Sequence, residues 1–219
     1  MTSTESDIYI ADGNITIFLG LHSNTFKEDI LHSSLLGSLV SNSSSIASED
    51  WMRSYTKILG SIFWITKSQR TQTPEINSAS IYNLAKLTLS SYLSAVQLKK
   101  IEECFNSIKK LPADSTAILA LSNRFHLANE NNDTSTICPL LTIICENKTV
   151  ISFNTLFTIP SPFDLAILDE EVLLETTGNA TQTTQWITHL EEDNYAAIRD
   201  TVIEKLGSKI KTNLFHIET

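Results

Sequence analysis

Residues 137–159, ICPLLTIICENKTVISFNTLFTI, decide the fold. Two runs within them, 137–145 and 149–159, are rich in β-branched and aromatic residues, which favour strands. The polar tripeptide at 146–148 is short enough to turn the chain back on itself, so the pattern predicts a β-hairpin. A hairpin of this length indicates an antiparallel sheet in the second half of the chain.

Further strands are expected on both sides of this hairpin. At the N-terminus, residues 8–10 and 15–21 are β-branched and are separated by a turn signal, Asp12-Gly13-Asn14. After the hairpin, two prolines interrupt the sheet, and three more strands are predicted at 163–168, 172–176 and 185–190.

Helical periodicity dominates the first half of the chain. The clearest stripe repeats at spacings of 3, 4 and 3, in Leu98, Ile101, Phe105 and Ile108, and Pro112 ends that helix. The predicted helices are 25–41, one from Glu49 onward, 79–94, 95–110, 114–124 and a final one at 195–206 followed by Gly207.

These patterns predict an α+β fold with a helix-rich N-terminal half and a strand-rich C-terminal half. We expect amphipathic helices to pack on one face of the antiparallel sheet, because both then share one core. The chain has only 6 glycines and 5 prolines and contains no flexible linker. It is therefore expected to form a single domain over residues 1–219.

Composition and charge exclude some functions. The chain has 219 residues, of which 42% are hydrophobic, and its net charge is −9. An acidic surface repels phosphate backbones, so nucleic acid is not an expected partner, and adsorption to anionic membranes is opposed as well. Membrane contact would need exposed apolar surface or a covalent lipid.

The N-terminus and the hydropathy bear on localisation. The first residues lack the basic region and apolar run of a secretory signal, and no run approaches the length of about 18 apolar residues that spans a bilayer. We therefore expect a cytoplasmic protein, or one exported without a cleavable signal, with any membrane association being peripheral.

Familiar catalytic and cofactor motifs are missing from the sequence. It has no GxGxxG, no GxxxxGK[ST] and no GxSxG, and its five histidines and three cysteines fit no zinc spacing. We expect no catalytic residue, no metal and no bound cofactor, and no protein partner is indicated. The enzymatic alternative is a thiol dyad of Cys145 with His126 or His189, which is disfavoured because Cys145 ends an apolar strand ahead of an acidic residue.

Three aromatic residues, Trp51, Tyr55 and Trp64, lie along the segment that begins at Glu49. Aromatic side chains most often anchor a helix to the core. The same rings would contact a membrane surface only if they were exposed, so the expected role of these residues is either packing in the core or contact with a membrane.

Three patterns together resemble a known family. They are WxxxYxxxLGxxxW at 51–64, Cys145 at a strand end followed by TVISFNTLF at 149–157, and NYxxxRxxxIxKLG at 194–207. This order resembles the Erwinia virulence factor family of bacterial and fungal proteins, whose members are linked to bacterial persistence in insect hosts. The resemblance spans about residues 50–217, most of the chain.

The resemblance implies an α+β fold and a cysteine that carries a fatty acyl chain. Cys145 is the matching residue by position, with Cys138 as the nearest rival, while Cys104 lies on a predicted helix face. A palmitate or similar chain on Cys145 would either fill an apolar cavity or anchor the protein to a membrane. At about 0.8 kcal/mol for each buried CH₂, such a chain supplies roughly 10 kcal/mol before entropy losses. The alternative is that Cys145 is an inert, buried apolar residue.

Three hypotheses follow from the sequence. The first is a non-enzymatic virulence or host-interaction protein that is S-acylated on Cys145 and associates with membranes. The second is a soluble structural or interaction module with three inert cysteines. The third is a thiol-dependent hydrolase or acyltransferase.

Overall fold

The computed structural model describes residues 6–42, 49–128, 134–159, 164–174 and 181–218. Its centre is one sheet in the order β11-β1-β2-β7-β8-β10-β3, to which β6 adds beside β8 and β5 beside β6. The strands are β1 Ser6–Ala11, β2 Asn14–Leu19, β3 Trp64–Gln72, β5 His126–Ala128, β6 Ser135–Ile137, β7 Leu140–Ile144, β8 Val150–Ile159, β10 Gln182–Leu190 and β11 Leu214–Ile217.

Both hairpins expected from the sequence are present. β1 pairs antiparallel with β2 across a turn in which Asp12 and Gly13 both have positive φ, and β7 pairs antiparallel with β8. A side chain at Gly13 would place its Cβ 2.2 Å from the Cβ of Arg124, so this tight turn requires glycine.

Parallel pairing occurs once among the strand pairs described, between β2 and β7, where Ile17 lies opposite Ile143. All the other pairs are antiparallel. The α+β prediction is thereby confirmed, with a mixed sheet in place of a purely antiparallel one.

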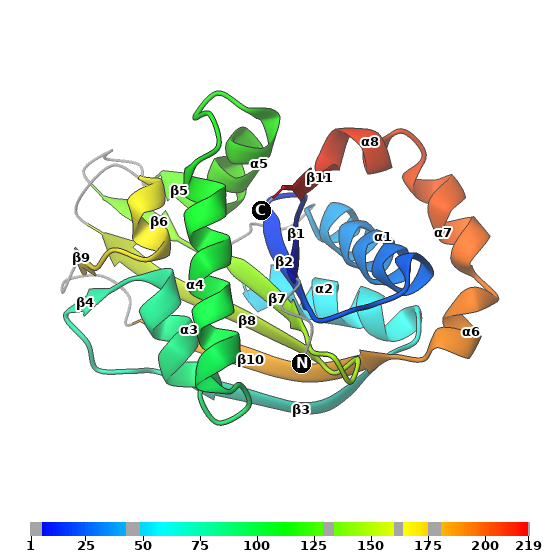
Figure 1. Ribbon diagram of the computed structural model, residues 1–219, viewed down its shortest axis with the longest axis horizontal. Coiled ribbons are helices and arrows are strands. Elements are labelled where there is room, and N and C mark those ends of the chain that lie inside the picture. Colours follow the sequence, from blue (N-terminus) through cyan, green and yellow to red (C-terminus); the bar gives the residue numbers. More distant parts are fainter. Residues whose placement is uncertain (1–5, 43–48, 129–133, 160–163, 175–180, 219) are drawn as a thin grey trace.

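Helices cover both faces of this sheet (Figure 1). On one face lie α3 Ile81–Leu89, α4 Ala95–Lys109 and α5 Thr116–Phe125. On the other lie α1 Asn24–Ser41 and α2 Glu49–Ser61, flanked by α6 Glu192–Ala196, α7 Arg199–Leu206 and α8 Lys209–Asn213.

Two hydrophobic cores result, one on each face of the sheet. Ile17, Ile143 and Phe153 pack toward α3, α4 and α5, whereas Phe18 and Ile144 pack toward α1 and α2. The expectation that helices cover one face was wrong. Every residue of β2 and β7 is buried, which is the pattern of strands covered on both sides.

Local departures from the predicted elements have identifiable causes. Of the predicted strand at 163–168, residue 163 lies outside the described residues, and Leu165–Leu168 form a 3₁₀ helix. Asp164 begins this helix, and its carboxylate accepts a hydrogen bond from the backbone N–H of Ala166. The predicted final helix is divided into α6 and α7 near Ile198. The predicted strand at 172–176 is described over β9 Val172–Leu173, which pairs with β4 Ser78–Ala79; residues 175 and 176 lie outside the described residues.

The third predicted helix is also shorter than expected. It ends at Leu89 and not at residue 94, so that residues 90–94 form a separate connection to α4. This connection borders a hollow at the β7–β8 turn, which Tyr92 helps to line.

Candidate functional site

The turn between β7 and β8 holds Cys145 in place. Its backbone N–H donates to the carbonyl oxygen of Thr149 at 2.9 Å, and its own carbonyl accepts from the N–H of Lys148 at 2.8 Å. Lys148 adopts a positive φ of 63°, which closes the turn. The thiol is therefore fixed at the end of the sheet by backbone bonds on either side of it.

Cys145 lines an open hollow of about 330 Å³ between this turn and the start of α4. The side chain is half-buried and packs against the core beneath α3 and α4. The hollow has mixed walls, formed by Tyr92, Gln97, Cys145, Glu146, Asn147, Thr149, Ile151 and Ile187. An apolar group attached to the sulfur would meet three large apolar side chains and a polar rim.

The environment of the thiol works against nucleophilic catalysis. Burial raises the pKa of Cys145, and the negative charge of Glu146 raises it further. The thiol therefore stays protonated at neutral pH, whereas a catalytic cysteine needs a stabilised thiolate. His189 does not line the hollow, and its Nε2 lies 2.6 Å from a carboxylate oxygen of Glu191. The side chain of His126 lies outside the described residues.

The other two cysteines are buried. Cys104 on α4 donates to the Ser6 hydroxyl at 3.8 Å, and burial raises its pKa to about 11. Cys138 lies between β6 and β7, where Asn154 Nδ2 is 3.6 Å from its sulfur, and burial raises its pKa as well. Of the three cysteines, all within the described residues, Cys145 is the accessible one.

The aromatic residues of α2 and β3 lie in the core between the sheet, α1 and α2. Trp51 and Tyr55 stack with ring centroids 5.1 Å apart, and the Tyr55 hydroxyl is 2.8 Å from the Ser34 hydroxyl. Trp64 donates from Nε1 to the Ser33 hydroxyl at 3.0 Å. All three aromatic side chains are buried, so in this conformation they pack and do not face a membrane.

Arg124 is a buried cation that the sequence did not indicate. Its guanidinium lies 3.9 Å above the Trp51 ring, and its Nε donates to the side-chain oxygen of Asn14 at 3.2 Å. The two terminal nitrogens form no hydrogen bond within the described residues, and burial lowers the pKa of Arg124. The only signal in the sequence was an arginine at the last turn of an apolar helix, which is usually exposed.

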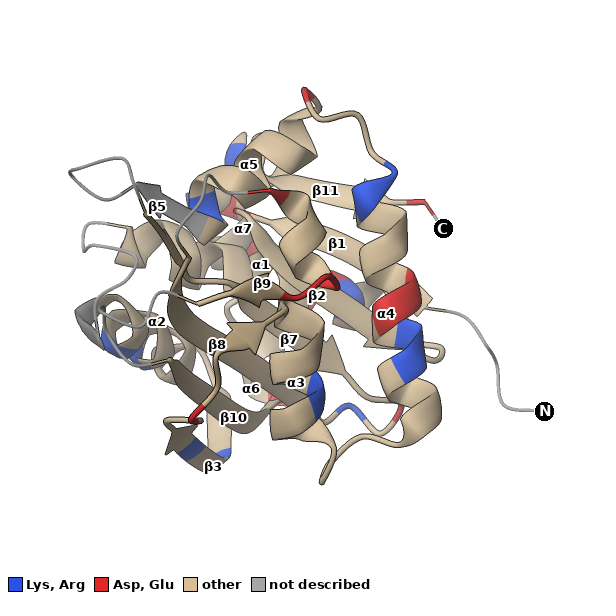
Figure 2. Ribbon diagram, turned by 90° about the vertical axis from the view of Figure 1, so that its left-hand side faces the viewer, with Lys and Arg blue, Asp and Glu red and all other residues tan. Residues whose placement is uncertain are grey.

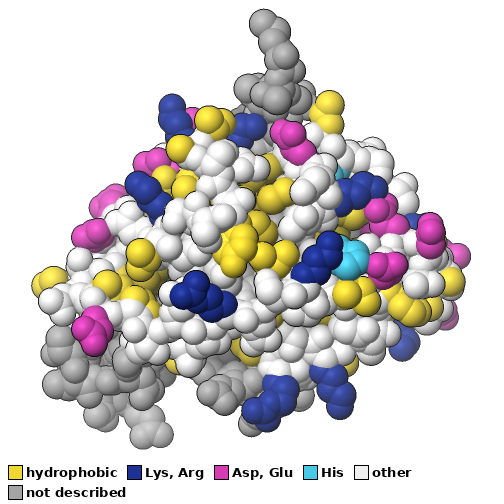
Figure 3. All heavy atoms as spheres, turned by 90° about the horizontal axis from the view of Figure 1, so that it is seen from below, with side chains coloured by type: hydrophobic (Ala, Val, Ile, Leu, Met, Phe, Trp, Pro, Cys, Tyr) yellow, Lys and Arg dark blue, Asp and Glu magenta, His cyan; other side chains and the backbone are white. Residues whose placement is uncertain are grey.

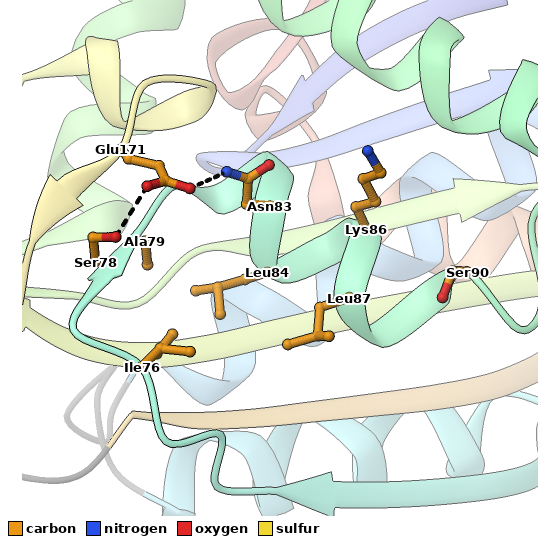
Figure 4. A pocket seen from close by; sticks show the side chains of 9 residues that line it. All are labelled: Ile76, Ser78, Ala79, Asn83, Leu84, Lys86, Leu87, Ser90 and Glu171. Carbon is orange, nitrogen blue, oxygen red and sulfur yellow. Dashed lines mark hydrogen bonds between the residues drawn. The ribbon is translucent and has the colours of Figure 1, made fainter.

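A second hollow, of about 450 Å³, lies beside α3 (Figure 4). Ile76, Leu84 and Leu87 converge to form its apolar floor. At the rim, the Glu171 carboxylate accepts hydrogen bonds from Ser78 at 3.0 Å and Asn83 at 2.6 Å. Such a hollow suits an apolar group.

No three His, Cys, Asp or Glu side chains gather closely enough to hold a metal ion within the described ranges. Among the helices that the structure describes, none combines the length and the hydropathy needed to cross a bilayer.

Comparisons with known proteins give likenesses of structure. No protein-family model matches the chain, and no curated protein sequence matches it. Among solved structures, the chain is similar to a delta-endotoxin, with a TM-score of 0.49 and 10% identity over 80% of each chain. It is also similar to the Evf virulence factor, with a TM-score of 0.40 and 9% identity over 93% of this chain and 82% of that one.

A third similar structure is the activated Cyt2Ba monomer from Bacillus thuringiensis subsp. israelensis, with a TM-score of 0.38 and 8% identity over 80% of this chain and 96% of the other. The Evf virulence factor among these structures agrees with the resemblance found in the sequence. At these identities and TM-scores, no activity follows from the likenesses.

Proposed function

We propose that this chain is a non-enzymatic host-interaction protein that carries a fatty acyl thioester on Cys145 and associates with membranes through it. The observation that carries the proposal is the position of Cys145. It is the accessible cysteine of the three, and its sulfur borders an open hollow with apolar side chains. The host-interaction part of the proposal rests on the resemblance to the Erwinia virulence factor family.

The modification is a transfer from a long-chain acyl thioester. The sulfur of Cys145 attacks the acyl carbonyl carbon, a new carbon–sulfur bond forms, and the donor's carbon–sulfur bond breaks. The donor leaves as a thiol that takes up the proton from Cys145. Because burial raises the pKa of this thiol, spontaneous transfer is slow, and an acyltransferase would speed it by removing the proton.

The walls of the hollow favour an acyl chain that leaves the protein over one that stays inside. Gln97, Glu146 and Asn147 supply polar surface, and the hollow is open to solvent. A methylene group gains about 0.8 kcal/mol only when it is removed from water into apolar surroundings. A bilayer offers such surroundings along the whole chain, so membrane insertion is the favoured state of the acyl group.

The test is the intact mass of the protein purified from its native source. We expect a mass above 24.4 kDa by one acyl chain, and we expect hydroxylamine, which cleaves thioesters, to remove the addition. The Cys145→Ser variant should lack it, whereas Cys138→Ser should keep it. An unmodified native protein, or an addition that stays in Cys145→Ser, would refute the proposal.

The second candidate is a soluble interaction module with unmodified cysteines. The half-buried position of Cys145 and the raised pKa of its thiol also suit an inert residue. An unmodified native mass, together with slow labelling of Cys145 by a thiol reagent at neutral pH, would favour this candidate. Fast labelling would instead favour a thiol-dependent enzyme.

A further inference from the structure

Exposed apolar side chains are concentrated where α3 meets α4. Nine large hydrophobic residues are exposed among the residues that the structure describes. Three of them, Leu87, Tyr92 and Val96, fall within ten residues at this connection, with 62%, 42% and 68% of their surface exposed. We call residues 87–96 the α3–α4 corner.

The corner is a rigid platform. The N–H groups of Tyr92 and Leu93 both donate to the carbonyl of Leu89 at 2.9 Å, and Ser94 caps α4 in a reciprocal pair with Gln97. Leu89 and Leu93 are buried in the core. These bonds and buried side chains fix the backbone, so Leu87, Tyr92 and Val96 stay largely exposed, although the Tyr92 hydroxyl accepts a hydrogen bond from Gln185 at 3.1 Å and Leu87 also lines the hollow beside α3.

The charge around the corner differs from that of the rest of the chain. No Asp or Glu occurs from residue 76 to 101, although the whole protein has a net charge of −9. The same stretch contains Lys86, Lys99 and Lys100, seen on α3 and on the first half of α4 in Figure 2. Carboxylates lie at its edges, at Glu75, Glu102, Glu103, Glu146 and Glu171, and Lys99 Nζ is 3.8 Å from a carboxylate oxygen of Glu103. The stretch itself therefore carries basic and no acidic side chains, and its charge is offset at the edges.

Viewed from below Figure 1, the molecule has hydrophobic side chains gathered near the middle of the face, with basic and acidic side chains around them (Figure 3). In the corner, exposed apolar side chains lie within a stretch that contains lysines and no acidic residue, which suits a surface that enters the boundary between headgroups and acyl chains of a bilayer with anionic lipids.

The corner adjoins the proposed acylation site. Tyr92 and Gln97 line the same hollow as Cys145. A single acyl chain gives only weak, reversible membrane binding, and stable anchoring needs a second signal. We propose that the α3–α4 corner is this second signal: Leu87, Tyr92 and Val96 enter an anionic phospholipid surface beside the chain on Cys145. The inference rests on the proposed function for its role beside the acyl chain, but the contact of the corner with lipid can be measured without acylation.

The experiment uses the full-length chain with Cys145→Ser, so that no acyl group contributes. Vesicles of equal parts phosphatidylcholine and phosphatidylserine are titrated in a sedimentation assay. The corner variant is Leu87→Gln with Val96→Gln. The matched control is Leu21→Gln with Leu119→Gln, which changes two residues of similar exposure, 71% and 50%, away from the corner. Circular dichroism and thermal unfolding confirm that both variants are folded.

We expect the corner variant to bind these vesicles about tenfold more weakly than its parent, which corresponds to about 1.4 kcal/mol, and the control to bind like the parent. Equal binding by the corner and control variants would overturn the inference. A parent that binds no vesicles would also overturn the inference. The acylation proposal would not be affected by that result, because the intact mass tests it separately. If the corner variant instead abolishes self-association measured by light scattering and leaves vesicle binding unchanged, the corner joins copies of this chain and the inference fails.

Discussion

The ion pair between Asp29 and Arg199 gives a quantitative test of how the C-terminal helices are held. Asp29 lies on α1 and is 2% exposed, whereas Arg199 begins α7 and is 31% exposed. The guanidinium donates to both carboxylate oxygens, from Nε at 2.6 Å and from a terminal nitrogen at 2.7 Å. The pair therefore joins segments 170 residues apart in sequence.

The two partners differ in what their loss leaves behind. Arg199→Met leaves a buried carboxylate without its cation, which destabilises by about 3–5 kcal/mol. Asp29→Asn leaves a guanidinium that reaches water, so the loss is about 1.5–3 kcal/mol, that of a hydrogen bond to a charged group. For a chain of this length, the first change lowers the melting temperature by roughly 6–20 °C.

The assay is urea unfolding followed by far-ultraviolet circular dichroism, with thermal scans on the same samples. The double variant should be less destabilised than Arg199→Met alone, because it contains no unpaired buried charge. Equal losses for the two single variants, or a loss below about 1 kcal/mol for Arg199→Met, would refute the assignment of the desolvated charge to Asp29.

Two other predictions concern stability. Gly13→Ala should destabilise the fold by more than about 2 kcal/mol, because φ is +79° and the new Cβ would lie 2.2 Å from the Cβ of Arg124. Gly60→Ala in α2, where nothing lies within 4 Å of the new Cβ, should stabilise it by about 0.5–1 kcal/mol. The same urea assay measures both changes, and changes of the opposite sign would contradict the reasoning. The free energy of unfolding should also fall as pH rises from about 9 to about 11, because the unfolded state releases the Cys104 proton at its ordinary pKa of 9.0 while the folded state keeps it up to about 11. A Cys104→Ala variant should lose less stability over this window than the unmodified chain, and an identical pH profile would contradict the reasoning.

Local patterns in the sequence were enough to predict the elements whose signals lie within a few residues. The turn at Asp12-Gly13 and the hairpin at residues 146–148 carry their own turn chemistry, so both were found. The stripe from Leu98 to Ile108 predicted α4 to within one residue of its observed end at Lys109. In these elements, the local secondary-structure propensity and the pattern of buried residues indicate the same structure.

Features that depend on distant partners were missed. β11 was not predicted from the sequence, because it is defined by pairing with β1, where Ile8 lies opposite Ile217, more than 200 residues away. The covering of both sheet faces could have been inferred from the apolar run Ile17–Leu19, in which apolar and polar residues do not alternate as they would in a half-exposed strand. The predicted helix at 79–94 included Tyr92, but α3 ends at Leu89, and the exposed corner that results has no local sequence signal.

The sequence predicted that Cys145 lies at the end of a strand. The structure adds that its thiol is half-buried beside Glu146, and this environment separates its possible roles. Catalysis needs the thiolate in every turnover, so an environment that raises the pKa of Cys145 slows each cycle. An acyl modification needs the thiolate once, and its product is a neutral thioester. The half-burial that disfavours a charged sulfur does not disfavour the uncharged ester, because no ion has to be desolvated. The same burial and the same Glu146 charge that argue against an enzyme are therefore compatible with a lasting acyl thioester at this position.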